Sequence, residues 1–380
     1  MLMVTTDRWR PDGGGRERYL AELVAHISAR GRRVSVLCGS PAAAAVFADC
    51  RVQRGPRPLR ELRLRAAVRD ARAADPALRV LALSPVCGAT HYQLHDGLFE
   101  DAFAVERDAM RSRLRRALVP ASIAFNHHRQ RLMADQMRMI SQAQAVMAFS
   151  RAAANAVVER VGIPAARVAI ARPGVDLSRF RPDPNGDARP NASAGTLRLA
   201  FVGHNFALKG LTTAIEALDR LRRNGVNATL TVAGADRPAW YRSLAGRLGV
   251  ATAVRFAGAL APDAVADLYR ASDLLVHPTF YDPFPRVVIE ALACGCPVVT
   301  TARCGAAEML TDGENGFVID DPCDAPSIAR RAAELTDPSR RSAVRRAAAD
   351  AGRRFEAAGH FDRVIEWLES IPRDLAERSW

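Results

Sequence analysis

Two carboxylates flank a segment with the features of a helix start. Asp282 and Glu290 are eight residues apart, and Pro285, Arg286 and Val287 lie between them. Proline suits the first position of a helix because its missing N–H costs no hydrogen bond there. We therefore expect a short helix to begin at Pro285, with backbone N–H groups at Arg286 and Val287 left unpaired. These groups lie at the positive end of the helix dipole and form a site suited to an anion.

An anion site between two hydrogen-bond-accepting carboxylates suits a phosphorylated, hydroxyl-rich ligand such as a nucleotide sugar. Gly295 is expected to end the helix, and Pro297 prevents its restart before a buried strand that opens at Val298. The alternative for this stretch alone is an ordinary helix packed beside a strand in an α/β protein.

Lys209 is the only lysine among the 54 basic residues of the sequence. A chain that uses arginine for nearly every cation keeps a lysine where a compact ammonium is needed and a planar guanidinium does not fit. The chance survival of one lysine is the alternative. Lys209 follows an expected strand, Leu197–Val202, in the segment GHNFALKG that begins at Gly203.

The first half of the chain predicts a parallel sheet. An expected strand at residues 1–6 is followed by a glycine loop, a helix at 16–30 and a strand at 34–38, which together form a βαβ unit. The loop glycines, Gly13, Gly14 and Gly15, let a ligand approach the backbone closely. The loop is not GxGxxG and no acidic residue ends the second strand, so a dehydrogenase-type dinucleotide site is poorly supported.

His95 and Asp96 directly follow another expected strand, at the position where ligands bind in parallel sheets. A solvent-exposed pair in a loop is the alternative for this dipeptide.

The second half repeats the alternation of strands and helices. Strands are expected at 197–202, 229–233, 254–257, 274–277 and 314–319, with helices between them and two helices at the end, the last near 361–371. We therefore expect two Rossmann-like, doubly wound parallel-sheet domains that face each other across a cleft. The expected boundaries are 1–175 and 197–357, with a Pro/Gly-rich linker at 176–196 and a final helix at about 358–380 that packs back on the first domain.

The positive charge is concentrated in the first half. Residues 1–181 hold 30 Arg against 16 Asp and Glu, a net charge of +14, whereas residues 182–380 have a net charge of −1. Two basic segments stand out, 57–72 and the series Arg107, Arg111 and Arg115. They favour an anionic partner, such as a membrane surface, a phosphorylated acceptor or nucleic acid, with a solvated face as the alternative. The basic segments lack interleaved aromatic residues and any nucleic-acid-binding motif, so no nucleic-acid partner is expected.

Other features narrow the class of protein. No apolar run reaches the roughly 18 residues needed to span a bilayer, and the N-terminus lacks the pattern of a signal peptide, so a cytoplasmic location is expected. The seven cysteines include no CxxC pair and no zinc spacing. Cys294, Cys296 and Cys304 are expected to be small buried residues rather than metal ligands.

These segments together resemble the family 4 retaining glycosyltransferases of the GT-B fold. The resemblance rests on Gly203 with Lys209-Gly210, on VRFAG at 254–258, and on Asp282-x7-Glu290 followed by GCPVV. PGVDLSRFRP and the N-terminal glycine loop agree in order and spacing, so the resemblance covers nearly the whole chain. Among relatives the chain is most similar to the lipopolysaccharide-core glucosyltransferases, through HYQLHDGLFEDAF and HPTFYDPFPRVVIEALACGCPVVTTARCG.

The resemblance implies a role for each matching residue. Glu290 would bind the donor ribose, Asp282 the hydroxyls of the donor sugar, and Lys209 the diphosphate, which the N–H groups of Arg286 and Val287 would cap. The backbone of Ala257 and Gly258 would read the base, and the implied donor site is completed by Gly203, His204 and Phe284. His95 and Asp96 would line the reaction centre, and with Asp282 and Lys209 they are the catalytic candidates. Gly13, Gly14 and Gly15 would let the donor phosphate and the acceptor approach.

Three positions depart from the family pattern. Asp282 replaces a glutamate and is one methylene shorter, which leaves the donor sugar open. His204 and Leu208 occupy the places near Lys209 where a second cation often stands, and Pro285 replaces a common glycine.

The resulting expectation is a retaining enzyme that moves a hexose from a nucleotide sugar, with UDP expected, to a glycan or glycolipid acceptor of lipopolysaccharide or cell-envelope polysaccharide synthesis. No metal and no other cofactor is expected. The basic first domain is expected to dock on the inner face of the cytoplasmic membrane as a peripheral protein. The alternatives are a nucleotide-sugar epimerase on the same fold and a catalytically impaired relative that binds glycans or anionic surfaces.

Overall fold

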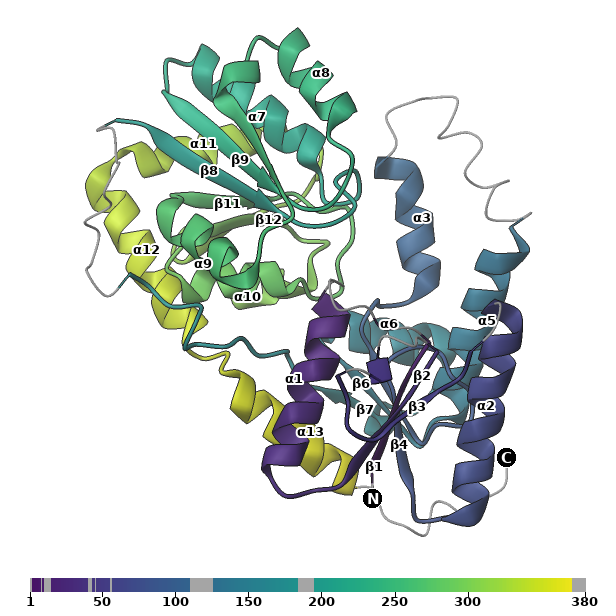
Figure 1. Cartoon of the computed structure of the whole chain (residues 1–380). Coiled ribbons are helices and arrows are strands. Elements are labelled where there is room, and N and C mark those ends of the chain that lie inside the picture. The colour runs from purple at the N-terminus through teal and green to yellow at the C-terminus, as the bar shows by residue number, and fades with distance from the viewer. Residues whose placement is uncertain are drawn as a thin grey trace. The chain divides into compact units, whose positions relative to one another are not determined.

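The computed structural model describes residues 2–7, 9, 15–39, 43–44, 46–54, 57–109, 126–183 and 195–370 (Figure 1). Internal contacts divide the chain into two compact units. The first unit comprises Met1–Phe103, Pro120–Arg172 and Ala358–Trp380, and the second comprises Ala104–Val119 and Pro173–Ala357. Within the described ranges, no helix combines the length and apolar character that crossing a bilayer requires.

The first unit contains a seven-stranded parallel sheet in the order β3-β2-β1-β4-β5-β6-β7. Its strands are β1 (Leu2–Thr6), β2 (Val34–Cys38), β3 (Cys50–Val52), β4 (Arg79–Ala82), β5 (His91–Leu94), β6 (Ala145–Ala148) and β7 (Val168–Ile170). The helices that follow these strands are α1 (Gly15–Ala29), α2 (Arg57–Ala74), α3 (Phe99–Ala109), α5 (His127–Gln142) and α6 (Arg151–Val161), and the last helix of the chain is α13 (Ala357–Ser370).

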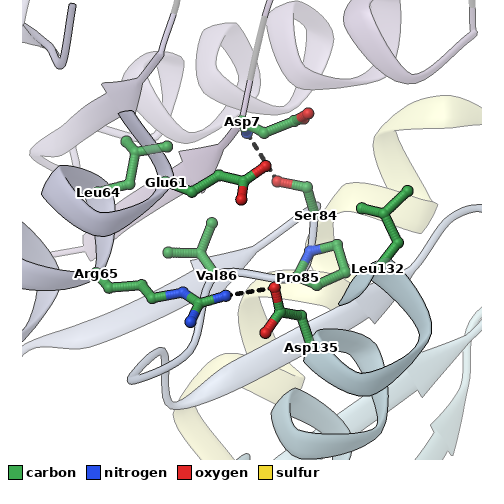
Figure 2. A pocket seen from close by; sticks show the side chains of 9 residues that line it. All are labelled: Asp7, Glu61, Leu64, Arg65, Ser84, Pro85, Val86, Leu132 and Asp135. Carbon is green, nitrogen blue, oxygen red and sulfur yellow. Dashed lines mark hydrogen bonds and ion pairs between the residues drawn. The ribbon is translucent and has the colours of Figure 1, made fainter. Parts of the chain in front are cut away.

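The strand order of the first sheet reverses direction between β1 and β4. At this point the chain leaves β1 toward Asp7 and β4 toward Ser84, and a ligand-binding crevice is common at such a switch in doubly wound sheets. A small pocket lies there, walled by Leu64, Val86 and Leu132 and bordered by an ion pair between Arg65 and Asp135 at 2.6 Å (Figure 2).

The second unit contains a six-stranded parallel sheet in the order β10-β9-β8-β11-β12-β13. Its strands are β8 (Leu197–Val202), β9 (Ala228–Ala233), β10 (Val254–Gly258), β11 (Leu274–His277), β12 (Val298–Thr301) and β13 (Gly316–Ile319). Its helices are α7 (Leu211–Arg223), α8 (Ala239–Arg247), α9 (Pro262–Ala271), α10 (Arg286–Ala293), α11 (Ala325–Ala333) and α12 (Pro338–Gly352).

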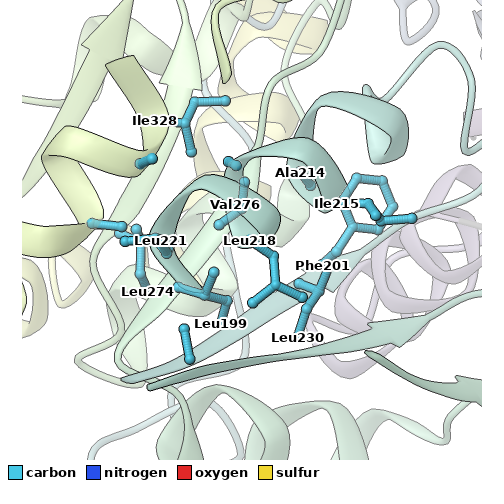
Figure 3. Packing of buried hydrophobic residues seen from close by; sticks show 14 of the residues in the cluster. Leu199, Phe201, Ala214, Ile215, Leu218, Leu221, Leu230, Leu274, Val276 and Ile328 are labelled. Carbon is cyan, nitrogen blue, oxygen red and sulfur yellow. The ribbon is translucent and has the colours of Figure 1, made fainter. Parts of the chain in front are cut away.

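Helices cover both faces of the second sheet, with α7 packed against α8 and α11, and α10 packed against α9 and α12 (Figure 1). The core beneath α7 explains why that helix forms. Its apolar residues recur at the spacing of one helical face, so that Ala214, Leu218 and Leu221 meet the strand residues Leu199 and Leu230 (Figure 3). All five side chains are buried, which fixes α7 and the loop before it on the sheet.

The prediction of two α/β halves with parallel sheets is confirmed. Three details differ. Pro285 is the N-cap residue with an extended backbone, φ −71° and ψ 121°, so α10 begins one residue later than predicted. Within the described residues, three helices rather than the predicted two follow β13. The three-residue strand β3 was also missed, since it is too short and too exposed to show a pattern.

Candidate functional site

The predicted donor residues of the second unit lie at one edge of its sheet. All strands are parallel, so their carboxyl ends point the same way. Gly203 follows the end of β8, Ala257 and Gly258 end β10, and the loop carrying Asp282 follows β11. In open α/β sheets this edge is where ligands bind. The fold therefore brings to one edge three segments that are separate in the sequence, with Gly203 and Gly258 more than 50 residues apart.

The centre of this edge is an ion pair between Lys209 and Asp282. Lys209 Nζ lies 2.5 Å from Asp282 Oδ2 and also donates a hydrogen bond to the Tyr281 carbonyl at 3.3 Å. The two charged side chains are 17% and 12% exposed, so most of their surface is removed from water while one side remains accessible. His277, the last residue of β11, places Nε2 3.8 Å from the same carboxylate oxygen and is 1% exposed.

The protonation states in this cluster follow from burial and charge. Burial alone would raise the pKa of Asp282, but the Lys209 ammonium, with help from His277, holds this pKa below its usual value. Burial lowers the pKa of His277, and this effect outweighs the neighbouring Asp282 carboxylate. At neutral pH the cluster is therefore a carboxylate, an ammonium and a neutral imidazole.

The loop of Lys209 and the loop of Asp282 are joined by their backbones. Phe280 N–H donates to the Leu208 carbonyl at 2.9 Å, and Thr279 Oγ1 donates to the same carbonyl at 3.2 Å. Gly210 has φ +77° and approaches so closely that an added Cβ would lie 2.1 Å from the Pro278 carbonyl oxygen. The position of the Lys209 ammonium is therefore set by the loop that follows β11 as well as by the loop that carries Lys209.

Asp282 is also tied to the segment after β12. Its carbonyl accepts a hydrogen bond from Gly305 N–H at 2.8 Å, and Asp282 pairs with Cys304 in an isolated parallel bridge. Burial raises the pKa of the Cys304 thiol to about 12. This thiol is therefore protonated and is a poor nucleophile.

Helix α10 begins where the anion site is predicted. Pro285 at the N-cap makes no side-chain capping bond, and Val288 N–H donates to the Pro285 carbonyl at 3.2 Å. The first-turn N–H groups of Arg286 and Val287 therefore belong to the positive end of the helix. Glu290, one turn later, is 1% exposed, and Phe284 before the helix is 5% exposed.

The remaining predicted donor residues border the same edge. Gly258 has φ +70° at an irregularity of the β10–β9 ladder, and its carbonyl accepts from Gly234 N–H at 2.8 Å. The Lys209 side chain passes beside Gly203, where its Cγ would lie 3.4 Å from an added Cβ. His204 is exposed.

In the first unit His95 and Asp96 follow β5, but their side chains have different partners. Asp96 accepts from Arg16 at 3.0 Å, and Arg16 also lies 3.6 Å from Asp7. Burial opposes the charge of Arg16, yet Asp96 and Asp7 outweigh it and raise the pKa of that guanidinium. His95 Nε2 instead lies 3.1 Å from Gln93 Oε1.

The glycine loop is only partly described. Gly15 begins α1, whereas Gly13 and Gly14 lie outside the described residues, as do Arg111 and Arg115 of the second basic segment and the Arg107 side chain. The first basic segment forms α2.

Sequence reasoning missed four polar residues near the carboxyl edge of the first sheet. Asp7 and Arg16 extend the Asp96 contact, and Arg65 with Asp135 borders the pocket of Figure 2. Asp7 could have been found, because it directly follows β1. The pairing of Arg65 with Asp135 could not, because it joins two helices 70 residues apart in the chain.

In the part of the chain that the structure describes, no group of three or more His, Cys, Asp and Glu residues is placed to hold a metal ion.

Comparisons with known proteins agree with this architecture. The family model described as "Glycosyltransferase Family 4" matches residues 13–179, and the model described as "Glycosyl transferases group 1" matches residues 187–353. The two matches are consecutive and together span most of the chain.

The curated relatives include D-inositol 3-phosphate glycosyltransferases. That of Acidothermus cellulolyticus is 32% identical over 261 residues, which cover 63% of this chain and 57% of the relative. That of Thermomonospora curvata is 32% identical over 257 residues, which cover 60% of this chain and 59% of the relative. The matched region thus spans less than two thirds of the length of these relatives.

Solved structures match over nearly the full chain. WaaG, described as a glycosyltransferase involved in lipopolysaccharide biosynthesis, has a TM-score of 0.76 at 24% identity and covers 98% of this chain and 100% of its own. Anabaena HepE in complex with UDP and glucose has a TM-score of 0.75 at 21% identity, covering 97% and 99%. Sucrose-phosphate synthase from Thermosynechococcus elongatus has a TM-score of 0.77 at 18% identity, covering 97% and 98%. The chain belongs to the family 4 glycosyltransferases and has the GT-B fold.

Proposed function

We propose that the protein is a retaining glycosyltransferase that moves a hexose from a UDP-sugar to a hydroxyl of a glycan or glycolipid. The observation that carries this proposal is the Lys209–Asp282 pair at the carboxyl edge of the second sheet, with the start of α10 following in the same loop. A cation and helix N–H groups suit a diphosphate, and a carboxylate beside them suits sugar hydroxyls.

The chemistry of the leaving group fits these residues. Departure of UDP from a sugar builds negative charge on the diphosphate while the sugar becomes oxocarbenium-like. Lys209 and the N–H groups of Arg286 and Val287 are placed in advance to stabilise that charge. Asp282 would orient the sugar, Glu290 the ribose, and the backbone at Ala257 and Gly258 the base.

Retention is proposed to proceed without a protein nucleophile. The acceptor hydroxyl would attack from the face that the diphosphate leaves, and the departing phosphate would take its proton. Cys304 beside Asp282 is a protonated thiol, which agrees with this route. Neither a metal nor another cofactor is required, because Lys209 and the helix start supply the positive field.

The support for UDP and for the acceptor comes from neighbours and relatives. HepE, of the same fold, is described in complex with UDP-glucose, and WaaG is described as acting in lipopolysaccharide biosynthesis. These support a UDP-hexose donor and a lipopolysaccharide or cell-envelope acceptor. The curated relatives are named for D-inositol 3-phosphate, which favours a phosphorylated polyol as the second candidate acceptor.

The test is a panel of nucleotide sugars. Thermal protection and donor hydrolysis are measured first, and transfer is then followed with a lipid-linked glycan and with inositol phosphate as acceptors. We expect protection by UDP-sugars that is lost in Lys209→Met and Glu290→Gln. Arg223→Met is the matched control, since Arg223 also pairs with an aspartate of the second unit, Asp219 at 2.8 Å, but lies on α7.

Three outcomes would contradict the proposal. Protection that survives in both site variants would overturn the donor-site assignment. Conversion of the donor sugar without an acceptor would indicate the epimerase alternative, and donor binding without any turnover would indicate a catalytically impaired relative.

Membrane docking through α2 is part of the proposal. The helix carries exposed Leu62 and Leu59, 55% and 42% accessible, beside exposed Arg63 and Arg69. Each basic residue near an anionic surface contributes about 1 kcal/mol. We expect cosedimentation with anionic vesicles that weakens as salt rises and in the Arg63→Gln/Arg69→Gln variant, and binding without salt dependence would contradict docking by charge.

A further inference from the structure

A buried hydrogen-bond relay in the first unit connects helix α13 with His95. His95 Nε2 lies 3.1 Å from Gln93 Oε1, Gln93 Nε2 lies 2.6 Å from the Tyr19 hydroxyl, and that hydroxyl lies 2.8 Å from His360 Nε2. The four residues come from β5, the loop after it, α1 and α13. Residues 341 positions apart in the chain thus share one hydrogen bond.

The amide of Gln93 gives the relay a direction. Its oxygen only accepts, so the bond to His95 requires a proton on His95 Nε2. Its nitrogen donates to the Tyr19 oxygen and also lies 3.3 Å from Met147 Sδ, which uses both amide hydrogens. The Tyr19 hydroxyl accepts from Gln93 and shares a hydrogen bond with His360 Nε2. The Gln93 amide therefore fixes the two bonds nearest His95, with His95 Nε2 and Gln93 Nε2 as the donors.

The relay is enclosed by apolar and aromatic groups. Gln93 and His360 are 0% exposed and Tyr19 is 2% exposed, so water does not compete for these bonds. The His95 ring meets Tyr19 and Phe149 edge-on, with ring centroids 4.8 Å apart in each case. Buried hydrogen bonds of this kind fix the orientation of the groups that share them, because each broken bond would leave a buried group unsatisfied.

We infer that Gln93, Tyr19 and His360 are positioning residues that hold His95 in the Nε2–H tautomer, so that Nδ1 is the nitrogen that accepts a hydrogen bond from a sugar hydroxyl. The inference rests on the proposed function and on the role that the family resemblance implies for His95, that of lining the reaction centre. The tautomer matters because the opposite one would present an N–H donor in place of an acceptor. A proton taken up at Nδ1 leaves the bond from Nε2 to Gln93 intact.

The inference also gives α13 a role beyond packing. This helix supplies His360, the last member of the relay, so α13 contributes to the orientation of a residue that follows β5.

The tautomer is measured directly by NMR of the full-length protein labelled with 15N at its eight histidines. The His95 signals are assigned by their loss in His95→Gln, and those of His360 by their loss in His360→Gln. We expect His95 to carry its proton on Nε2. Observation of the Nδ1–H tautomer at His95 would overturn the inference.

Substitution of Gln93 separates positioning from packing. Gln93→Leu removes the acceptor, and we expect a mixture of His95 tautomers, whereas Gln93→Glu keeps an acceptor and retains the Nε2–H form. Tyr19→Phe removes a single oxygen and is the milder variant if Gln93→Leu does not fold; it should shift the His360 signals. Tyr92→Phe is the matched control, a buried tyrosine of β5 whose hydroxyl accepts from Gln136 instead. Unchanged tautomers in Gln93→Leu, or unchanged His360 signals in Tyr19→Phe, would contradict the inference.

Activity then tests the link to the reaction. Once transfer is detected, we expect Gln93→Leu to lower kcat by about 10- to 100-fold, the range found when groups that orient metal-bound histidines are removed, with a smaller change in the KM for the donor. If the wild-type protein transfers no sugar, the proposed function is contradicted. The NMR measurement would still show whether His95 is held in the Nε2–H tautomer. If Gln93→Leu changes the tautomer of His95 but leaves kcat unchanged, the relay has no role in the reaction.

Discussion

Lys209 Nζ and Asp282 Oδ2 are 2.5 Å apart, although 73 residues separate them in the chain. The contact exists because β8 and β11 are neighbours in the sheet, so the loops that follow them leave the same edge side by side. Without a ligand, the ammonium is balanced by the carboxylate. A bound diphosphate would bring a second anion to Lys209 and free Asp282 to accept hydrogen bonds from sugar hydroxyls.

Lys209→Met is expected to weaken donor binding and turnover together. The substitution removes the side-chain cation that we propose binds the diphosphate of the donor. Removal of one preorganised donor costs about 10²- to 10³-fold in kcat at comparable sites. Lys209→Arg is expected to recover only part of the activity, because the planar guanidinium does not reproduce the compact ammonium between Asp282 and the Tyr281 carbonyl. Steady-state kinetics with the best donor of the panel provides the measurement, and full activity in Lys209→Arg would contradict the need for a lysine.

Asp282→Asn is expected to change the pH dependence of stability. Lys209 holds the pKa of Asp282 below its usual value, so the folded state binds this proton less readily than the unfolded state does. The resulting stabilisation is present above about pH 4, the pKa of an unfolded aspartate, and is lost as the pH falls below it. The asparagine variant should therefore be less stable at pH 7 and lose less stability between pH 4 and pH 2.

Urea unfolding across this pH range measures the effect of Asp282→Asn. Asp263→Asn is the matched control, because Asp263 pairs with Arg179 at 2.7 Å but its side chain is 80% exposed. An exposed pair contributes about 0–1 kcal/mol, so the control should follow the wild-type curve closely. If the stability of wild type and of Asp282→Asn changes with pH in parallel, Lys209 does not shift the pKa of the Asp282 carboxyl.

His91 is expected to make the first unit sensitive to mild acid. Burial, with Arg79 and Arg72 adding to it, lowers the pKa of His91 to about 3. The side chain is 1% exposed and lies edge-on against Trp367 of α13. Between about pH 6.5 and pH 3 the unfolded chain binds a proton at His91 that the folded protein does not bind. The free energy of unfolding therefore falls by about 1.4 kcal/mol per pH unit as the pH drops.

His91→Gln should remove this contribution and flatten the loss of stability between pH 6.5 and pH 4.5. A shallower slope remains, because burial also lowers the pKa of His277. His128→Gln, at an exposed position of α5, is the control and should leave the slope unchanged. Equal slopes for the wild type and His91→Gln would show that His91 is protonated in the folded state.

The elements of this fold were predictable where the pattern is local. The strands Leu197–Val202 and Leu274–His277 are short apolar runs bounded by turn residues, and the structure forms both with these bounds. Two helices were predicted after the last strand and three form; α12 gives only a weak apolar period, because its buried face is built mostly from alanine among arginines. The start of α10 was misplaced by one residue because Pro285 adopts an extended backbone and serves as the cap.

The site was predictable only in its parts. Lys209 was singled out by its rarity and Asp282 by its spacing from Glu290, and their roles stay predictions. Their contact depends on which strands are neighbours in the sheet, and no local pattern encodes that order. The relay to His95 was not predictable either, because Tyr19 and His360 lie 341 positions apart in the chain.

Gly210→Ala is expected to destabilise the second unit and to displace Lys209. Gly210 has φ +77°, and a Cβ there would lie 2.1 Å from the backbone oxygen of Pro278, so the β8 and β11 loops would have to separate. A left-handed backbone costs a non-glycine residue about 1–2 kcal/mol, and the clash adds to that cost. The matched control for Gly210→Ala is Gly225→Ala. Gly225 lies just after α7 and has φ +81°, but no atom lies within 4 Å of a Cβ added there. Gly225→Ala should lose only the backbone term and keep wild-type donor affinity, whereas Gly210→Ala should lose about 3 kcal/mol or more and bind UDP-sugars more weakly. Unfolding free energies from urea titration and donor affinities from calorimetry measure both effects. Equal destabilisation by the two variants would show that the two loops can separate without cost, and the ion pair of Lys209 with Asp282 would then not depend on this contact.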